Sequence, residues 1–231
     1  MRSNKSDLAN LIHGLSTVSI GAKPLVGNLS LFKSIAVVGS SCSGKTTLIN
    51  EIKKFTLCRT TKVVVPLRYI TRPKRKNDIP DENIYISRKE FLKKVKSSQI
   101  YFRWKKKLDS TREEMFGFKP VIAGTMPVYS GNNGLLYNND TVYPRGILDT
   151  IIFVGIYAPD KVRKKRLFMR SPDLIQDNPE ESRYRLGDSS EKIIKHVHFV
   201  INNYDSYLFN SGHDIVELVK RLKKCLILRV T

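Results

Sequence analysis

The stretch of sequence that decides the fold is Gly39-Ser40-Ser41-Cys42-Ser43-Gly44-Lys45-Thr46. It matches the phosphate-binding loop pattern G-x-x-x-x-G-K-[ST] at every fixed position. A strand-like apolar run at residues 31–38 precedes it and a helical pattern at 46–55 follows it, which is the context that this loop requires. At average composition, an accidental match in a chain of this size is roughly a one-per-cent event. The sequence therefore predicts a P-loop α/β fold.

The residue types in this loop suit a nucleoside triphosphate. The glycines allow a turn tight enough for successive backbone N–H groups to point at the β-phosphate, and the following helix directs its positive end there too. We expect Lys45 to reach the β- and γ-phosphates and Thr46 to give its hydroxyl to Mg²⁺. The expected cofactors are therefore ATP and Mg²⁺, with ATP bound by residues 39–46 and Thr47.

Apolar runs alternate with helical patterns along the rest of the chain. Further strands are expected at 62–66, 121–123, 149–157 and 198–202, and further helices at 87–95, 160–170, 179–195 and 214–225. The remainder of 67–119 is charged and rich in loop residues, and 126–148 has the composition of loops or a broken helix. The alternation predicts a parallel, doubly wound sheet in residues 31–231. Residues 1–30 are expected to be an N-terminal extension with one short helix.

The chain has 231 residues and a formal net charge of +20, which favours anionic partners without choosing between them. No nucleic-acid motif accompanies this charge, so nucleic acid is not the expected partner. No apolar run approaches the ~20 residues that span a bilayer, so no membrane insertion is expected. Cys42, Cys58 and Cys225 are widely spaced and odd in number, which argues against a disulfide framework and favours a cytoplasmic setting. The oligomeric state stays open.

A second set of motifs narrows the class. The stretch Ile70-Thr71-Arg72-Pro73-Lys74-Arg75 is followed by Asp78 and by Tyr85-Ile86-Ser87-Arg88-Lys89-Glu90-Phe91. It resembles the guanylate kinase family, which carries T-T-R-x-P-R-x-x-E and then Y-x-F-[VI]-S-x-x-x-F after its P-loop. The stretches 163–170, 185–191 and 199–202 resemble that family's lid and the strand after it. The resemblance runs in collinear order from about residue 33 to residue 225.

This resemblance implies a small acceptor-binding subdomain at about residues 68–118. Arg72 and Arg75 would hold the phosphate of the acceptor, because guanidinium forks donate paired hydrogen bonds at a fixed geometry. Asp78 and Tyr85 occupy matching motif positions and would take part in the same binding site.

The resemblance also implies an arginine-bearing lid at about residues 170–187. Arg166, Arg170 and Arg185 would close over ATP and, together with the P-loop lysine, neutralise charge on the transferred phosphoryl group. Asn202 would lie near the adenine.

The sequence departs from the family where the family binds guanine. The acidic residue of the motif F-x-E-W is replaced by Arg103, next to Trp104, and the aspartate of L-x-I-D has no counterpart in 121–125. Arg103 offers only hydrogen-bond donors, which cannot pair with the N1–H and 2-amino donors of guanine, so we expect it to bind a second phosphate of a sugar bisphosphate. The alternative is that Arg103 points to solvent. The ribose 1,5-bisphosphate phosphokinases also lack both acids and keep a tryptophan at this place.

Two further family positions differ. Phe118 stands where the family has a hydroxyl residue after glycine, and Asn83 aligns with a phosphate-binding tyrosine. A shift of register would bring Tyr85 to that place.

The predicted function is an ATP-dependent phosphotransferase that moves the γ-phosphoryl group to a small phosphate-bearing acceptor. A ribose 1,5-bisphosphate-type acceptor is slightly favoured over GMP or another nucleoside monophosphate. The alternative is a guanylate kinase-like interaction module with weakened catalysis that still binds ATP. Such modules usually lose the P-loop, whereas Gly44, Lys45 and Thr46 are all present here.

Overall fold

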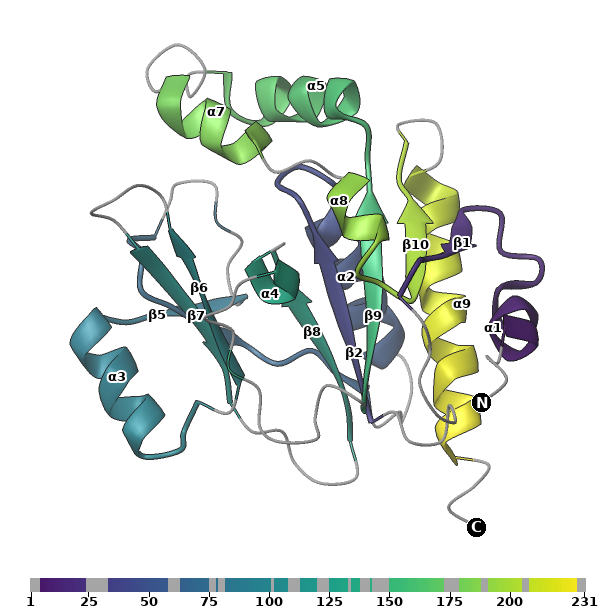
Figure 1. Cartoon of the computed structure of the whole chain (residues 1–231), viewed down its shortest axis with the longest axis horizontal. Helices are drawn as coiled ribbons and strands as arrows, with labels where there is room; N and C mark the ends of the chain where they lie inside the picture. The colour runs from purple at the N-terminus through teal and green to yellow at the C-terminus, as the bar shows by residue number, and fades with distance from the viewer. Residues whose placement is uncertain are drawn as a thin grey trace.

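Two β-sheets organise the chain in the computed structural model (Figure 1). The structure describes residues 5–23, 33–57, 63–74, 78, 82–100, 102–107, 113–119, 125–132, 134–137, 142, 150–172, 179–187, 191–204 and 208–227. Arg75 and the strand predicted at 121–123 lie outside these residues.

The larger sheet has six strands in the order β1-β10-β9-β2-β8-β3. Their bounds are Val18–Ile20 for β1, Ser34–Gly39 for β2, Val63–Val64 for β3, Met126–Gly131 for β8, Ile151–Tyr157 for β9 and Phe199–Asn202 for β10. All neighbouring pairs are parallel except β1 with β10. The predicted α/β class with a largely parallel sheet is therefore confirmed, and β2, which ends in the phosphate-binding loop, lies near the centre of the sheet.

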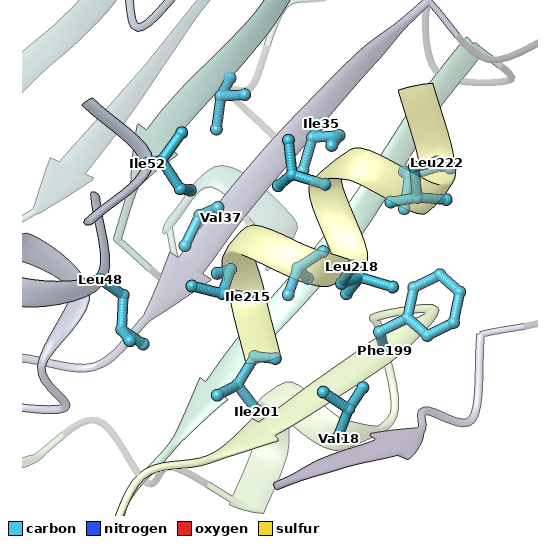
Figure 2. Packing of buried hydrophobic residues seen from close by; sticks show 14 of the residues in the cluster. Val18, Ile35, Val37, Leu48, Ile52, Phe199, Ile201, Ile215, Leu218 and Leu222 are labelled. Carbon is cyan, nitrogen blue, oxygen red and sulfur yellow. The ribbon is translucent and has the colours of Figure 1, made fainter. Parts of the chain in front are cut away.

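Helices α2 (Lys45–Leu57) and α9 (Leu208–Ile227) cover one face of this sheet. Figure 2 shows their apolar side chains meeting those of the strands. The contacting residues include Leu48, Ile52, Ile215, Leu218 and Leu222 from the helices, and Ile35, Val37, Phe199 and Ile201 from the strands. β2 is buried along its whole length, so its two sets of alternating side chains serve two cores.

The smaller sheet packs on the other face. Its four strands run in the order β5-β4-β7-β6. Their bounds are Arg68–Ile70 for β4, Asn83–Tyr85 for β5, Phe102–Lys107 for β6 and Glu113–Phe118 for β7. Helix α3 (Arg88–Lys96) covers the outer side of this sheet, and the hydroxyl of Ser87 caps its first turn by accepting a hydrogen bond from the Glu90 amide at 3.1 Å. The helix predicted at 87–95 is confirmed.

The prediction that the rest of 67–119 is loop-rich was wrong. β6 alternates apolar and basic residues, with Phe102 and Trp104 fully buried and Arg103 and Lys105 partly exposed. Alternation of this kind is the pattern of a half-buried strand, and the high charge of the segment concealed it.

The loops predicted at 126–148 were also wrong in part. Residues 126–131 form β8, which pairs in parallel with both β2 and β3, and Gly134–Tyr137 form the short helix α4. Pro127, Ser130 and Gly131 have low intrinsic strand preference, but pairing on both sides of β8 outweighs that preference.

The described part of residues 1–30 joins the larger sheet. Helix α1 (Lys5–Ile12) is the short helix predicted there, and β1 adds an antiparallel edge strand to β10. The buried carboxylate of Asp214 accepts hydrogen bonds from the amide and hydroxyl of Thr17 at 2.7 and 2.8 Å. The guanidinium of Arg221 donates to the carbonyls of Leu11 and His13. Two polar anchors on α9 thus hold this segment against the domain.

Helices α5 (Asp160–Arg170) and α7 (Pro179–Gly187) lie beyond the carboxyl ends of the parallel strands, at the top of Figure 1. The helix predicted at 160–170 is confirmed, and the one predicted at 179–195 corresponds to α7 and to α8 (Glu191–Ile194). Among the described residues, no helix combines the length and the apolar character needed to span a bilayer.

Candidate functional site

The predicted phosphate-binding loop has two residues with left-handed backbone angles. It joins the end of β2 to the start of α2, and both Cys42 (φ 61°) and Gly44 (φ 96°) have positive φ values. A Cβ at Gly44 would lie 2.0 Å from the side-chain nitrogen of Asn203. Glycine is therefore required at position 44 for its conformation and for the close approach of Asn203. The carboxyl end of a central parallel strand is where open α/β sheets bind ligands.

Lys45 lies folded over its own loop. Its ammonium group donates to the carbonyl oxygens of Gly39 and Ser40 at 2.6 and 2.9 Å. Burial, together with the nearby cations Arg68 and Lys106, lowers the pKa of Lys45 to about 7. A polyphosphate at this place would compensate this concentration of positive charge.

Thr46 and Thr47 follow in the first turn of α2. The structure leaves Thr46 half-buried at the end of the loop and Thr47 exposed. The described residues contain no cluster of three or more His, Cys, Asp or Glu side chains suited to a metal ion. Thr46 nevertheless fits Mg²⁺ bound together with ATP, because Mg²⁺ accepts a hydroxyl oxygen and keeps several waters and phosphate oxygens as its other ligands.

Arg166, predicted to act on the phosphoryl group, lies against the loop from the side of α5. It donates to the carbonyls of Ser43 and Cys42 at 3.3 and 3.4 Å, and to the carbonyl of Asn203 at 3.0 Å. Among the other predicted lid residues, Arg170 is exposed at the end of α5 and Arg185 is half-buried near the end of α7.

Arg163 is a residue that the sequence analysis did not single out as part of the site. Its side chain is fully buried and donates to the carbonyl of Ser41 at 2.9 Å and to that of Arg185 at 3.0 Å. It also forms an ion pair with Asp160 at 2.8 Å. In sequence it is one more cation in the basic run 163–166, and only burial distinguishes it.

The asparagine that contacts the loop is Asn203, whereas the prediction placed the adjacent Asn202 near the adenine. The Asn203 side-chain amide donates to the carbonyl of Ser43 at 2.7 Å, and its Oδ1 is buried with no hydrogen-bond partner among the described residues. Asn202 is the last residue of β10 and forms backbone hydrogen bonds with Thr17 and with the hydroxyl of Ser211. The point where the strand ends decides which of two adjacent asparagines turns toward the loop.

Three of the predicted acceptor residues gather on the smaller sheet. Arg72 and Asp78 form a two-pronged ion pair with distances of 2.6 and 2.7 Å, and both side chains are nearly buried. The Arg72 guanidinium lies over the ring of Tyr85 at 5.7 Å. Burial and a hydrogen bond with Asp78 raise the pKa of Tyr85 above its ordinary value. Arg75, the fourth, lies outside the described residues.

Arg68 adds a further cation that the sequence analysis missed. It donates twice to the side-chain oxygen of Asn83, at 2.9 and 3.1 Å, and once to the carbonyl of Ser130 at 3.1 Å. Burial lowers the pKa of Arg68 to about 10. Asn83 also donates to the Tyr85 hydroxyl at 3.3 Å, so both candidates for the phosphate-binding tyrosine position lie on one face. The spacing of Arg68, Ile70 and Arg72 could have indicated that Arg68 lies beside Arg72, because alternate residues of a strand share a face.

Lys106 and Glu114 complete this face. They are direct partners across β6 and β7, and they share the face of Trp104 and Phe116 by strand alternation. Glu114 is buried and lies close enough to Arg72 to favour the charged form of the Arg72 guanidinium. Lys106 lies close enough to the P-loop lysine to lower its pKa. This face of the smaller sheet is therefore turned toward the phosphate-binding loop.

Arg103 does not join the other predicted acceptor residues. It is paired with Gly117, and a Cβ at Gly117 would meet Ile100 and Phe91 on the side of α3. Directly paired residues share a face, so Arg103 lies on the α3 side, opposite Trp104. This placement does not support the predicted binding of the acceptor by Arg103. Because the Trp104 ring is buried between the two sheets, strand alternation places its neighbour Arg103 on the opposite face.

Aromatic rings fill the space between the two sheets. Trp104 is fully buried and stacks on Phe116 with ring centres 5.3 Å apart, and its indole nitrogen donates to the side-chain oxygen of Asn132 at 2.9 Å. Phe118, where the family has a hydroxyl, packs against Tyr129 of β8 at 4.9 Å. The rings join the smaller sheet to the larger one in a single core.

Comparisons with known proteins agree with this geometry at the level of the fold. No protein-family model matches the chain, and no curated protein sequence matches it significantly. Among solved structures, the chain is similar to the guanylate kinase from Anaplasma phagocytophilum, with a TM-score of 0.51 and 13% sequence identity. The match covers 87% of this chain and 96% of that one. The protein therefore has a guanylate kinase-like fold.

Proposed function

We propose that the protein is an ATP-dependent phosphotransferase that moves the γ-phosphoryl group of ATP to a small phosphate-bearing acceptor. The observation that carries this proposal is that the smaller sheet brings Arg68 and Lys106 within electrostatic reach of Lys45 in the phosphate-binding loop. Three elements, namely β4, β6 and the phosphate-binding loop, thus line one cationic site. Such a site has a P-loop on one side and an arginine–tyrosine pair on the other. It therefore offers phosphate-binding groups for two phosphorylated substrates.

Each group has a role that its chemistry allows. The loop amides and Lys45 would hold the triphosphate, and Thr46 would provide a ligand for Mg²⁺, which supplies charge neutralisation between the phosphates. Arg72 would exchange part of its ion pair with Asp78 for the acceptor phosphate, which it can grip with two parallel hydrogen bonds. An acceptor oxygen then forms a bond to the γ-phosphorus as the bond to ADP breaks. In this proposal α5 and α7 form the lid.

For the acceptor we propose a ribose 1,5-bisphosphate-type sugar phosphate over GMP. The inward residues of β6 are Phe102, Trp104 and Lys106, none of which can accept a hydrogen bond from guanine. Glu114, a buried carboxylate on this face, is placed opposite Lys106 and close to Arg72. A guanine facing β6 would leave its N1–H and 2-amino donors unpaired, at a cost of about 1–3 kcal/mol for each one, unless it drew Glu114 away from Arg72.

The second candidate is a guanylate kinase-like interaction module that binds ATP without efficient transfer. The ring packing of Trp104 and Phe116 between the sheets favours it, because a filled interior leaves less space for an acceptor. The loop around Lys45 favours the kinase, since it keeps every group needed for the triphosphate.

The test is an acceptor panel with ATP and Mg²⁺, containing GMP, other nucleoside monophosphates, ribose 5-phosphate and ribose 1,5-bisphosphate, with ADP release as the readout. We expect turnover with a sugar phosphate, poor turnover with GMP, and none for Lys45→Ala. Lys164→Ala, an exposed lysine on α5, is the matched control. Binding of ATP without turnover of any acceptor would support the module, and efficient GMP phosphorylation would exclude the proposed acceptor class.

A further inference from the structure

Every carbonyl oxygen of the phosphate-binding loop from Gly39 to Gly44 accepts a hydrogen bond. The donors are Lys45 for Gly39 and Ser40, Arg163 for Ser41, Arg166 for Cys42 and Ser43, Asn203 also for Ser43, and the amide of Leu48 for Gly44. Side chains thus supply the donors that a helix or sheet would otherwise provide. Two of these donors are arginines from one helix.

Arg163 and Arg166 are three positions apart on α5 and therefore lie on the same face of that helix. Arg163 is fully buried, and Asp160 at the start of the helix balances its charge at 2.8 Å. Arg166 is half-buried and reaches the loop and the carbonyl of Asn203 at once. Both guanidinium groups donate hydrogen bonds to backbone oxygens of the loop. A role in binding phosphate would instead require those N–H groups to point toward the ligand.

Holding these oxygens has a consequence for the loop amides. In a planar trans peptide the C=O and the following N–H point in opposite directions. The bond from Arg163 to the Ser41 carbonyl therefore turns the Cys42 amide away from α5. The bonds from Arg166 and Asn203 to the Ser43 carbonyl do the same for the Gly44 amide. Together with the positive φ angles at Cys42 and Gly44, this arrangement directs two N–H groups to one side, which is the requirement for an anion-binding nest.

Arg163 also reaches the end of α7. Its second terminal nitrogen donates to the carbonyl of Arg185 at 3.0 Å and is 3.5 Å from that of Leu186. Carbonyl groups at the C-terminal end of a helix carry partial negative charge, which a guanidinium stabilises. One buried side chain therefore connects the loop with α7, so a displacement of α7 would alter the hydrogen bond that holds the loop backbone.

We propose that Arg163 and Arg166 are positioning residues that hold the phosphate-binding loop open for ATP by pinning its carbonyl oxygens from outside, and that Arg163 couples this conformation to the position of α7. The proposal rests on the proposed ATP site but assigns Arg166 a different role from direct action on the phosphoryl group.

The experiment compares the full-length wild type with Arg163→Met, Arg166→Met and, as matched control, Lys164→Met, which removes an exposed positive charge from the same helix. Hydrogen exchange of residues 39–46 is measured in the ligand-free proteins, and the Kd for ATP with Mg²⁺ by calorimetry. We expect faster loop exchange and a Kd raised roughly tenfold or more in both arginine variants, since hydrogen bonds to charged groups are the stronger ones. Lys164→Met should match the wild type.

Arg163→Lys is the rescue variant, because one ammonium group can still donate to the Ser41 carbonyl. It should restore hydrogen exchange of the loop toward the wild-type rate. Hydrogen exchange in residues 179–187 should be faster than in the wild type in both Arg163 variants, because neither keeps the full contact with the end of α7. If Arg163→Met does not fold, Arg166→Met decides the outcome. Unchanged loop exchange together with an unchanged Kd would overturn the proposal, as would a fall in kcat alone for Arg166→Met. Failure of the proposed function is distinguishable: a wild type that binds ATP but turns over no acceptor would fail as a kinase and still test this proposal through its loop exchange and Kd, whereas a wild type that binds no ATP would exclude the ATP site itself.

Discussion

Raising the pH should weaken ATP binding, because the lysine of the phosphate-binding loop loses its proton near neutrality. In the ligand-free protein the pKa of Lys45 is lowered from 10.5 to about 7, first by burial and then by the neighbouring cations Arg68, Lys106 and Arg163. A triphosphate placed on the loop brings several negative charges to this ammonium group and so raises its pKa. We therefore expect the proposed binding of ATP to be coupled to uptake of a proton.

The sign and the size of the effect follow from this linkage. Affinity is greatest where free Lys45 is already protonated, below pH 7, and declines as the pH rises through the free-state pKa. As long as the complex stays protonated, the association constant falls about fivefold from pH 7 to 8 and close to tenfold from pH 8 to 9. At pH 8 about 0.9 proton should be taken up for each nucleotide bound.

Calorimetry in two buffers of different ionisation enthalpy measures this uptake directly. The range above pH 7.5 is suited to it, because a phosphate monoester has its second pKa at about 6 and the ligand then no longer titrates. Lys45→Arg keeps its charge throughout and is the control, for which affinity should be nearly independent of pH. If the wild type showed no proton uptake at pH 8, or bound ATP more tightly at pH 9 than at pH 7, the reasoning about Lys45 would be refuted.

Three further outcomes are expected. Arg72→Ala should raise the KM for the acceptor roughly ten- to hundredfold while the Kd for ATP stays unchanged, since it removes a charged phosphate ligand; a change in ATP affinity alone would contradict this role. Trp104→Ala should lower the free energy of unfolding by about 3–5 kcal/mol in urea titrations, because it empties a fully buried ring site; a loss below 1 kcal/mol would show that the sheets do not depend on the ring. An ATP analogue should slow hydrogen exchange in residues 170–187 and 68–118 if they close on ligand; equal exchange with and without it would contradict closure.

The parts of the fold that could be predicted from sequence depend on neighbouring residues alone. The loop at 39–46 is a local motif whose glycine and lysine perform their tasks within a few residues of each other. Helix α5 and strand β9 were also predictable, because each combines a continuous pattern with a clear break at its end. In all three, the deciding interactions span a short stretch of chain.

The smaller sheet could not be predicted in the same way. β6 has the sequence Phe-Arg-Trp-Lys-Lys-Lys, and its charge indicates a loop unless a partner for Phe102 and Trp104 is known. That partner is the ring pair Phe116 and Phe118 together with Tyr129, which lies on the larger sheet. Aligning the chain with a family motif placed an arginine at the guanine position, but the direction of a side chain on a strand depends on which face is buried.

The cations of the site illustrate what sequence leaves open. A net charge of +20 spreads over the chain, and nothing in the run 163–166 distinguishes Arg163 from its neighbours. The structure makes Arg163 fully buried and leaves Lys164 exposed.

Arg68, Lys106 and Lys45 come from three separate elements, and burial together with the charges of Arg68 and Lys106 disfavours the charged form of Lys45. Such a cluster is unfavourable in the free protein, since like charges repel and burial removes their hydration. A polyanionic ligand reverses both effects at once. The cost in the ligand-free state is therefore an argument for a phosphate-binding site that does not depend on the likeness of the fold.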